Sequence, residues 1–161
     1  MLDLKKKVKS IDIPDTLCTP WGVTLKLLPV TEKKRHFWLW SSTPNQGKTT
    51  WVEQELQKLN SYEYVVGEKY QTIHTLCRII TLDEYNTASL KVSELNKMCD
   101  NSTTYLVKGG TGVKLSEKPY IFILCNKSIE TLYPNMYELI KARFIEVEVK
   151  LCSTQNPVLI P

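Results

Sequence analysis

Residues 37–51, FWLWSSTPNQGKTTW, decide the fold of this chain. The apolar run at 37–40 predicts a buried strand, and a polar loop follows it at 41–47. From Lys48 onward the pattern is helical, because the apolar residues beyond position 50 recur near helical spacing with polar residues between them. We therefore expect a strand, a loop of small and polar residues, and a helix over 49–59.

The loop carries the end of a phosphate-binding P-loop pattern. Gly47-Lys48-Thr49 matches the end of GxxxxGK(S/T), whereas Ser42 stands where that pattern has its first glycine. Such a loop turns backbone N–H groups toward a phosphate, while its lysine reaches the outer phosphates and its threonine ligates Mg²⁺. The alternative is an ordinary polar turn with a lysine at a helix start. The residues predicted to bind nucleotide are Ser42, Thr43, Pro44, Asn45, Gln46, Gly47, Lys48, Thr49 and Thr50.

The composition indicates one globular domain inside a cell. The chain has 161 residues, a net charge of +4, and no apolar run that fits a membrane span or a signal peptide. Its five cysteines include no CxxC pair, which indicates reduced thiols. His36 and His74 stand alone in the sequence, so we do not expect a zinc site. The mild positive charge permits contact with nucleic acid without requiring it.

Strands and helices alternate along the chain. Residues 1–20 look irregular, 31–36 look like a polar, basic turn, and the last ten look like a tail. The predicted strands lie at 22–28, 37–40, 62–66, 76–82, 120–125 and 144–151, the helices at 49–59, 87–99, 128–133 and 135–142, and a glycine-tipped hairpin at 104–115. This order predicts an α/β fold with a mainly parallel central sheet flanked by helices. The last strand alternates polar and apolar residues, so we expect it at an edge.

Two adjacent carboxylates, Asp83 and Glu84, follow the apolar strand at 76–82. Parallel sheets bind ligands at the carboxyl ends of their strands, and paired acids there are costly unless they hold something positive. In a P-loop ATPase the acid at this place holds Mg²⁺ with the loop threonine, and a neighbouring acid polarises the attacking water. We assign Asp83 to the metal and Glu84 to the water. The alternative is a surface pair that caps the next helix.

Two further polar residues complete the candidate site. Asn126 ends the strand at 120–125, where its amide would orient the water or contact the γ-phosphate; a turn asparagine is the alternative. Arg143 precedes the last strand, where it would reach the nucleotide of a neighbouring subunit as an arginine finger. An ordinary surface arginine is the alternative for Arg143.

Four elements in this order resemble the superfamily 3 helicase domain of replication initiator (Rep) proteins of circular single-stranded DNA viruses and related plasmids. They are a Walker A loop at 42–49, a Walker B strand ending Leu82-Asp83-Glu84, a B′ element at Lys108-Gly109-Gly110 and a motif C strand ending at Asn126. The most specific stretch is TTYLVKGGTGVKLSEKPYIFILCNKSIETLY, residues 103–133. KARFIEVEV, residues 141–149, resembles the arginine-finger region, and the resemblance covers residues 35–150.

The resemblance implies an AAA+-like P-loop NTPase core with a DNA-binding β-hairpin. It implies the following roles: Lys48 and Thr49 for ATP and Mg²⁺, Asp83 for Mg²⁺, Glu84 as catalytic base, Asn126 as sensor, Arg143 as a finger acting in trans, and Lys108, Gly109, Gly110 and Lys114 for single-stranded DNA. The family forms hexameric rings that move 3′ to 5′ and do not involve a membrane. The location would be the host nucleus for a eukaryotic virus and the bacterial cytoplasm for a plasmid.

The chain departs from the family at two places. Ser42 replaces a glycine, which could weaken nucleotide binding if that position needs a positive φ. The nicking nuclease of full-length Rep proteins needs a His-apolar-His pair that this sequence lacks, and the YxxK match at 105–108 lies inside the hairpin and is read as coincidence. We therefore expect the helicase part of a larger initiator, with a linker or oligomerisation remnant at 1–30, the ATPase domain at 31–152 and a tail at 153–161.

Three other functions stay open. A superfamily 3 ATPase of RNA viruses shares these motifs, but a membrane-binding helix or a zinc site would accompany it. A nucleic-acid-binding and assembly module with weak or no ATPase activity would fit Ser42 and the short N-terminal segment. A small-molecule kinase would not need the hairpin lysine, Lys108.

Overall fold

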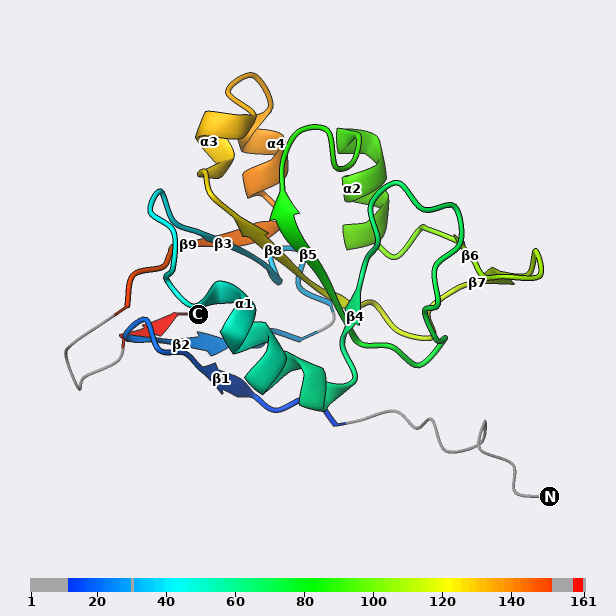
Figure 1. The fold of residues 1–161 in the computed structure, drawn as a ribbon, viewed down its shortest axis with the longest axis horizontal. Helices are drawn as coiled ribbons and strands as arrows, with labels where there is room; N and C mark the ends of the chain where they lie inside the picture. The colour runs from blue at the N-terminus through cyan, green and yellow to red at the C-terminus, as the bar shows by residue number, and fades with distance from the viewer. Residues whose placement is uncertain (1–11, 30, 152–157, 161) are drawn as a thin grey trace.

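A five-stranded parallel sheet forms the centre of the protein (Figure 1). The computed structural model describes residues 12–29, 31–151 and 158–160. The strands, in spatial order, are β4 (Tyr62–Glu63), β5 (Ile79–Tyr85), β8 (Tyr120–Cys125), β3 (His36–Trp40) and β9 (Phe144–Glu148). Every neighbouring pair in this sheet is parallel. This arrangement confirms the predicted α/β class with a mainly parallel sheet and places β9 at an edge, as expected.

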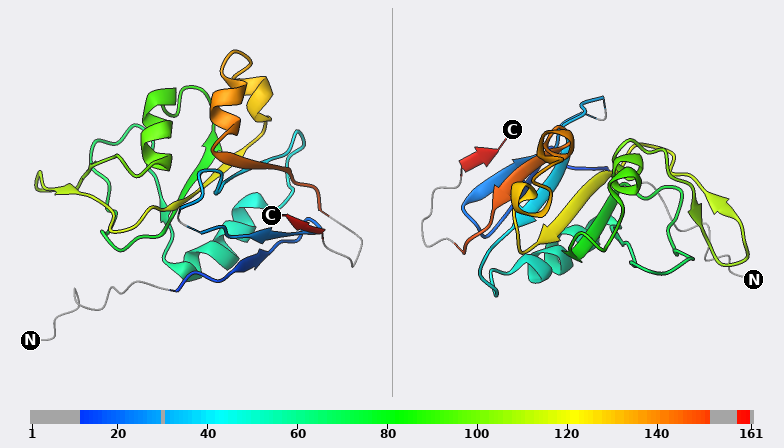
Figure 2. Two further views of the ribbon diagram at one scale, coloured as in Figure 1. Left: turned by 180° about the vertical axis from the view of Figure 1, so that it is seen from behind. Right: turned by 90° about the horizontal axis from the view of Figure 1, so that it is seen from above.

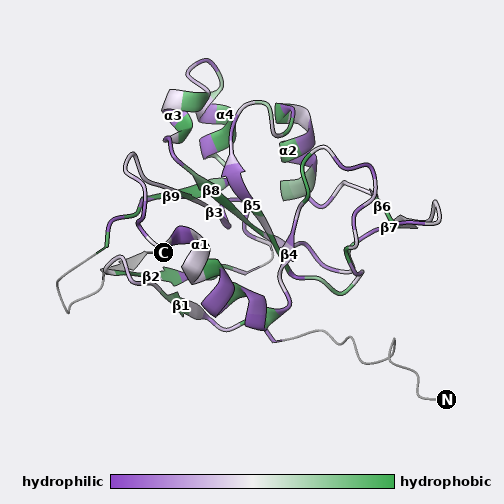
Figure 3. Ribbon diagram, viewed as in Figure 1, coloured by the Kyte–Doolittle hydropathy of each residue, from purple (hydrophilic) through white to green (hydrophobic). Residues whose placement is uncertain are grey.

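The central strands are buried on both faces, which explains their near-continuous apolar sequences. All six residues of β8 are buried, and four of the five residues of β3 are. The hydropathy colouring shows this apolar centre between more polar helices and loops (Figure 3). Side chains alternate across the sheet, so Phe37 and Leu39 enter one core cluster and Trp38 enters the other.

Helices cover both faces of this sheet (Figures 1 and 2). The segment that follows β3 begins as α1 (Lys48–Trp51) and continues as a π-helix (Val52–Leu56) and a 3₁₀ turn (Gln57–Leu59), so the predicted helix at 49–59 is confirmed. On the opposite face lie α2 (Val92–Cys99), α3 (Ile129–Leu132) and α4 (Tyr137–Lys141). α2 starts five residues later than predicted, at the point where Glu94 accepts a hydrogen bond from the Lys91 N–H. In the described part of the chain no helix has the length and apolarity to cross a bilayer.

A second, smaller sheet packs beside the first, and of its three strands only the middle one was predicted, at 22–28. It contains β1 (Thr16–Cys18), β2 (Val23–Lys26) and β10 (Val158–Ile160), with β2 in the middle. Leu17 and Leu25 share a buried cluster with Phe37 and Trp51, so the predicted boundary at residue 30 does not separate two packing units. β1 and β10 lie in segments that we had predicted to be irregular (1–20) and a tail (153–161), and with three residues each they are too short for a periodic pattern to show. The predicted boundary at residue 152 lies outside the described residues.

The glycine-tipped hairpin is present but shorter than predicted. β6 (Tyr105–Leu106) pairs antiparallel with β7 (Gly112–Val113), and the tip closes through a 3.0 Å bond from the Val107 N–H to the Thr111 carbonyl. The hairpin projects away from the main sheet on the side of β4 (Figure 2). Gly109 and Gly110 have φ of 106° and 85°, which a residue with a Cβ rarely adopts.

His36 is a buried structural residue, whereas we had predicted a polar turn at 31–36. It opens β3 and is 1 % exposed. Its Nδ1 accepts the Ile121 N–H at 2.9 Å, so its Nε2 carries the proton and donates to the Cys99 carbonyl at 2.9 Å. Burial, with a smaller effect of the neighbouring Arg35 charge, lowers the pKa of His36 to about 3. One neutral imidazole thus joins β3, β8 and the end of α2.

Candidate active site

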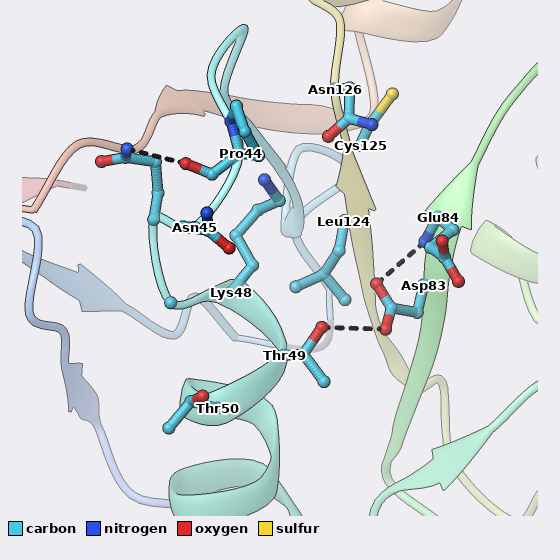
Figure 4. Close-up of a pocket in the computed structure, with 12 residues that line it drawn as sticks. Pro44, Asn45, Lys48, Thr49, Thr50, Asp83, Glu84, Leu124, Cys125 and Asn126 are labelled. Atoms are coloured by element: carbon cyan, nitrogen blue, oxygen red, sulfur yellow. Dashed lines mark hydrogen bonds between the residues drawn. The ribbon is translucent and has the colours of Figure 1, made fainter.

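The predicted nucleotide loop, the acidic pair and Asn126 surround one cavity at the carboxyl ends of β3, β5 and β8. The cavity has a volume of about 640 Å³. It is lined by Pro44, Asn45, Gln46, Gly47, Lys48, Thr49, Thr50, Asp83, Glu84, Leu124, Cys125 and Asn126 (Figure 4). Ser42 and Thr43, which we also predicted to bind nucleotide, are absent from this described lining.

The backbone of the loop alternates in handedness where it faces the cavity. Asn45 has φ of 63° and Gly47 has φ of 83°, and the right-handed helix starts directly after Gly47. Left-handed residues next to right-handed ones bring successive N–H groups to one side, which makes an anion-binding concavity. Ser42 does not adopt a positive φ, so the glycine of the usual pattern has no conformational advantage there.

The loop is anchored to distant parts of the chain. The Trp21 Nε1–H donates to the Gln46 carbonyl at 2.6 Å, and the Trp21 ring lies 5.2 Å from that of Trp51. The Gln46 side-chain oxygen accepts the Leu151 N–H at 2.9 Å. The loop is therefore held from the β1–β2 connection on one side and from the segment after β9 on the other.

Lys48 bonds to a buried serine that sequence analysis missed. Its Nζ lies 2.6 Å from the Ser41 Oγ, which in turn donates to the Thr43 carbonyl at 2.9 Å. Partial burial lowers the pKa of Lys48, and the charge of Asp83 opposes that shift. The signal for Ser41 was present, because Phe37, Leu39 and position 41 share one face of a strand under alternation. That face is the one that α1 covers.

Thr49, on α1, contacts Asp83, on β5, although β3, which leads into α1, is not a neighbour of β5 in the sheet. The Thr49 Oγ1 donates to the Asp83 Oδ2 at 3.2 Å, across the end of β8 (Figure 4). Hydroxyl and carboxylate oxygens are the ligands that Mg²⁺ takes, usually with phosphate oxygens and water in the rest of its shell. Within the described residues no group of three or more His, Cys, Asp or Glu side chains could hold a metal by itself. The pair therefore fits a metal that a phosphate ligand helps to hold.

Glu84 stands on a β-bulge. The pairing of β5 with β8 shifts register between Leu82 and Tyr85, and Glu84 has φ of 51°. Its N–H bonds to the Asp83 Oδ1 at 2.8 Å, while its side chain is exposed. β5 thus runs to Tyr85, and the acidic pair lies inside the strand end instead of after it. The bulge returns Tyr85 to the core, where its hydroxyl meets that of Tyr133 at 2.8 Å.

Asn126 lies between the loop and the acidic pair. It follows β8, and β8 lies between β3 and β5 in the sheet. Its side chain is exposed and contributes to the cavity lining (Figure 4). An amide in this place can reach a group bound between Lys48 and Glu84.

Arg143 and the hairpin residues do not join this cavity. Arg143 lies at the amino end of β9, where its Nε and Nη2 bind the two carboxylate oxygens of Asp100 at 3.2 and 2.9 Å. This pairing raises the pKa of Arg143 and lowers that of Asp100. Lys108 and Lys114 are exposed, and the β6–β7 hairpin lies well away from α1, which begins at the end of the loop (Figure 1).

The comparisons with family models and with curated proteins identified no relative of this chain. No family model matches the chain, and no curated protein matches it at a significant level. The functional assignment therefore rests on the residues of the cavity and their geometry.

Proposed function

We propose that this chain binds a nucleoside triphosphate with Mg²⁺ in the cavity at the ends of β3, β5 and β8 and hydrolyses it. The observation that carries the proposal is the meeting of Thr49 and Asp83 beside Lys48. Thr49 lies on α1, which follows β3 through the loop, and Asp83 lies on β5, with β8 between β3 and β5. A surface acidic pair that merely caps a helix would not require this contact.

The cavity suits a polyphosphate in size and charge. Its volume of about 640 Å³ falls in the range of about 300–1,000 Å³ typical of small-molecule sites. Lys48 brings a positive charge whose only hydrogen bond among the described residues is to the Ser41 hydroxyl. A phosphate oxygen would form a stronger, charge-assisted bond with that ammonium group.

The two adjacent acids would have different roles, Asp83 in binding the metal and Glu84 in activating water. Thr49 and Asp83 would hold Mg²⁺, which would neutralise charge on the transferred phosphate. Glu84, exposed at the rim, would accept a proton from the attacking water. Asn126 would orient that water or the γ-phosphate from its place between the loop and the acids.

We further propose that hydrolysis serves movement on single-stranded DNA, as in the helicase domain of a rolling-circle replication initiator. The hairpin supports this part of the proposal, because it presents Lys108 on a projecting, glycine-containing tip. An exposed lysine at such a tip suits contact with phosphates irrespective of sequence. In a hexameric ring with 3′-to-5′ movement, six such tips would line the DNA path.

The weak-ATPase alternative loses one of its supports. It relied in part on Ser42 as a defect in the loop, but Ser42 does not need a positive φ and the described cavity lining does not include it. Hydrolysis by this chain therefore remains the stronger proposal.

A steady-state phosphate-release assay, with and without single-stranded DNA, tests the proposal. We expect Mg²⁺-dependent hydrolysis that DNA stimulates. Lys48→Ala should weaken ATP binding by at least about tenfold, because it removes a charged hydrogen bond. The control is Lys97→Ala, which changes an exposed lysine of α2 that lines neither this cavity nor the start of α1.

Glu84→Gln separates binding from chemistry. It should leave ATP affinity near the wild-type value, measured by calorimetry, and lower hydrolysis by about 10²–10⁴-fold. Loss of ATP binding in this variant would show that our role for Glu84 is wrong. No hydrolysis by the wild-type chain at high protein concentration, with DNA present, would refute the ATPase proposal.

A further inference from the structure

A second cavity lies beside the first, and the two share lining residues at the end of the loop and the start of α1. Its volume is about 420 Å³. It is lined by Cys18, Thr19, Pro20, Gly47, Thr50, Trp51, Gln54, Glu55 and Leu151. Gly47 and Thr50 line both cavities. Three separate segments of the chain therefore converge beside the start of α1.

The lining of this cavity is more apolar than polar. Trp51 forms a buried wall, fixed by a 2.8 Å bond from its Nε1–H to the Cys18 carbonyl. Pro20 comes from the β1–β2 connection, and Leu151 projects from the segment after β9 with 58 % of its surface exposed. An apolar side chain left exposed at a cavity rim gains free energy when a ligand covers it.

Several polar groups that line this cavity already form hydrogen bonds within the protein. The Thr19 hydroxyl donates to the Val23 carbonyl at 2.6 Å, and the Cys18 carbonyl accepts from Trp51. Thr50 and Gln54 are exposed to water on the surface of the helix, and the Glu55 carboxylate already pairs with Lys58 at 3.0 Å. The site thus offers apolar surface to the face of a planar group and few fixed hydrogen bonds to its edge.

We propose that this cavity holds the base and ribose of the nucleotide whose phosphates occupy the first cavity; this inference rests on the proposed function. Thr49 faces Asp83, and Thr50 is the next residue on the helix, about 100° further around its axis. A ligand that leaves the phosphate site past Gly47 and Thr50 therefore enters the second cavity. The volume and the largely apolar lining suit a nucleobase, and the shortage of fixed edge contacts predicts little discrimination between bases.

Leu151 would close over the ligand from the rim. Its N–H is held by the Gln46 side chain, and its Cδ2 lies 3.8 Å from the point where a Cβ on Gly47 would stand. The same glutamine therefore connects the phosphate loop with the proposed cover of the base.

Cys18 supplies a direct test of occupancy. It is exposed and lines the cavity, whereas Cys77 and Cys99 are buried and report any unfolding. The rate of Cys18 alkylation by iodoacetamide would be followed by peptide mass spectrometry with ATP, with inorganic tripolyphosphate and with neither. We expect ATP at saturation to slow alkylation by about tenfold or more and tripolyphosphate to leave the rate unchanged.

Calorimetry in the same buffer separates the two proposals. If tripolyphosphate and ATP both bind and neither protects Cys18, the base does not occupy this cavity, although the phosphate site stands. If neither ligand binds, the proposed function and this inference both fail. Equal protection by both ligands would mean that closure of the loop, and not the base, covers Cys18, which would also overturn the inference.

Leu151→Ala provides a second measurement. Because Leu151 is largely exposed, the variant should fold normally, and it should lose about tenfold in ATP affinity while keeping tripolyphosphate affinity. Leu139→Ala is the control, since Leu139 is a similarly exposed leucine on α4, away from the loop. Unchanged ATP affinity in Leu151→Ala would refute the proposed contact.

Discussion

Acidification should unfold this protein through His36. The folded protein keeps the imidazole neutral, with its pKa lowered to about 3 by burial, whereas the unfolded chain has the ordinary value of about 6.5. Between these two values the unfolded state binds one more proton than the folded state. The free energy of unfolding therefore falls as pH falls, by about 1.4 kcal/mol per pH unit.

The total effect is large compared with the stability of a domain. The window spans about 3.5 pH units, which corresponds to an upper limit of roughly 5 kcal/mol, against typical domain stabilities of about 5–15 kcal/mol. Protonation would also break the bond in which Nδ1 accepts the Ile121 N–H. The loss is complete only when pH falls below the folded pKa, and the full contribution is present above pH 6.5.

Urea unfolding at a series of pH values from 7 to 4 measures this effect. His36→Gln should be less stable than wild type at pH 7, and the difference between the two proteins should shrink by about 1.4 kcal/mol for each unit below pH 6.5. Carboxylates titrate in both proteins and cancel in the comparison. His74→Gln, at an exposed histidine, is the control for replacing a histidine as such. Parallel stability curves for wild type and His36→Gln would refute the reasoning.

Three further outcomes are expected. Lys108→Ala should weaken single-stranded DNA binding at low salt, measured by fluorescence anisotropy, and leave ATP binding unchanged; Lys141→Ala on α4 is the control, and equal effects of the two would deny the hairpin a special role. Arg143→Ala and Asp100→Ala should destabilise the protein similarly because they break one ion pair, but only Arg143→Ala should lower hydrolysis in assembled rings; similar hydrolysis in both variants would make the arginine purely structural. Trp21→Phe removes the donor to the Gln46 carbonyl and should weaken ATP binding several-fold with a loss of about 0.5–1.5 kcal/mol in stability, and unchanged binding would contradict our view of how the loop is held.

The sequence predicted the central sheet well because its strands carry strong signals. The buried runs of β3 and β8 are long, apolar and bounded by polar residues, and the strand predicted at 120–125 agrees with β8 at both ends. The place of the loop at the end of β3, and its proximity to the acidic pair, followed from the rule that parallel strands end at one edge of the sheet. Contacts that follow from backbone direction were therefore predictable.

The sequence did not predict features that depend on tertiary contacts. Arg35 and His36 looked like a polar turn, yet both are buried; Arg35 stacks over the Tyr120 ring at 3.9 Å, and His36 bonds to two backbone groups. Trp21 and Leu151 are far from the loop in sequence, and no local pattern links them to Gln46. The bulge at Glu84 was also hidden, because a single irregular residue changes no periodicity.

Glu84 brings two requirements into conflict at a single position. A left-handed backbone costs a residue with a Cβ about 1–2 kcal/mol, and glycine or asparagine would occupy the φ of 51° more easily. Neither residue offers a carboxylate beside Asp83. A screen of position 84 for heat resistance should therefore favour glycine or asparagine, while a screen for hydrolysis should favour glutamate. Any programme that selected this protein for stability alone would lose its proposed catalytic base early, a direct case of a trade-off between stability and activity.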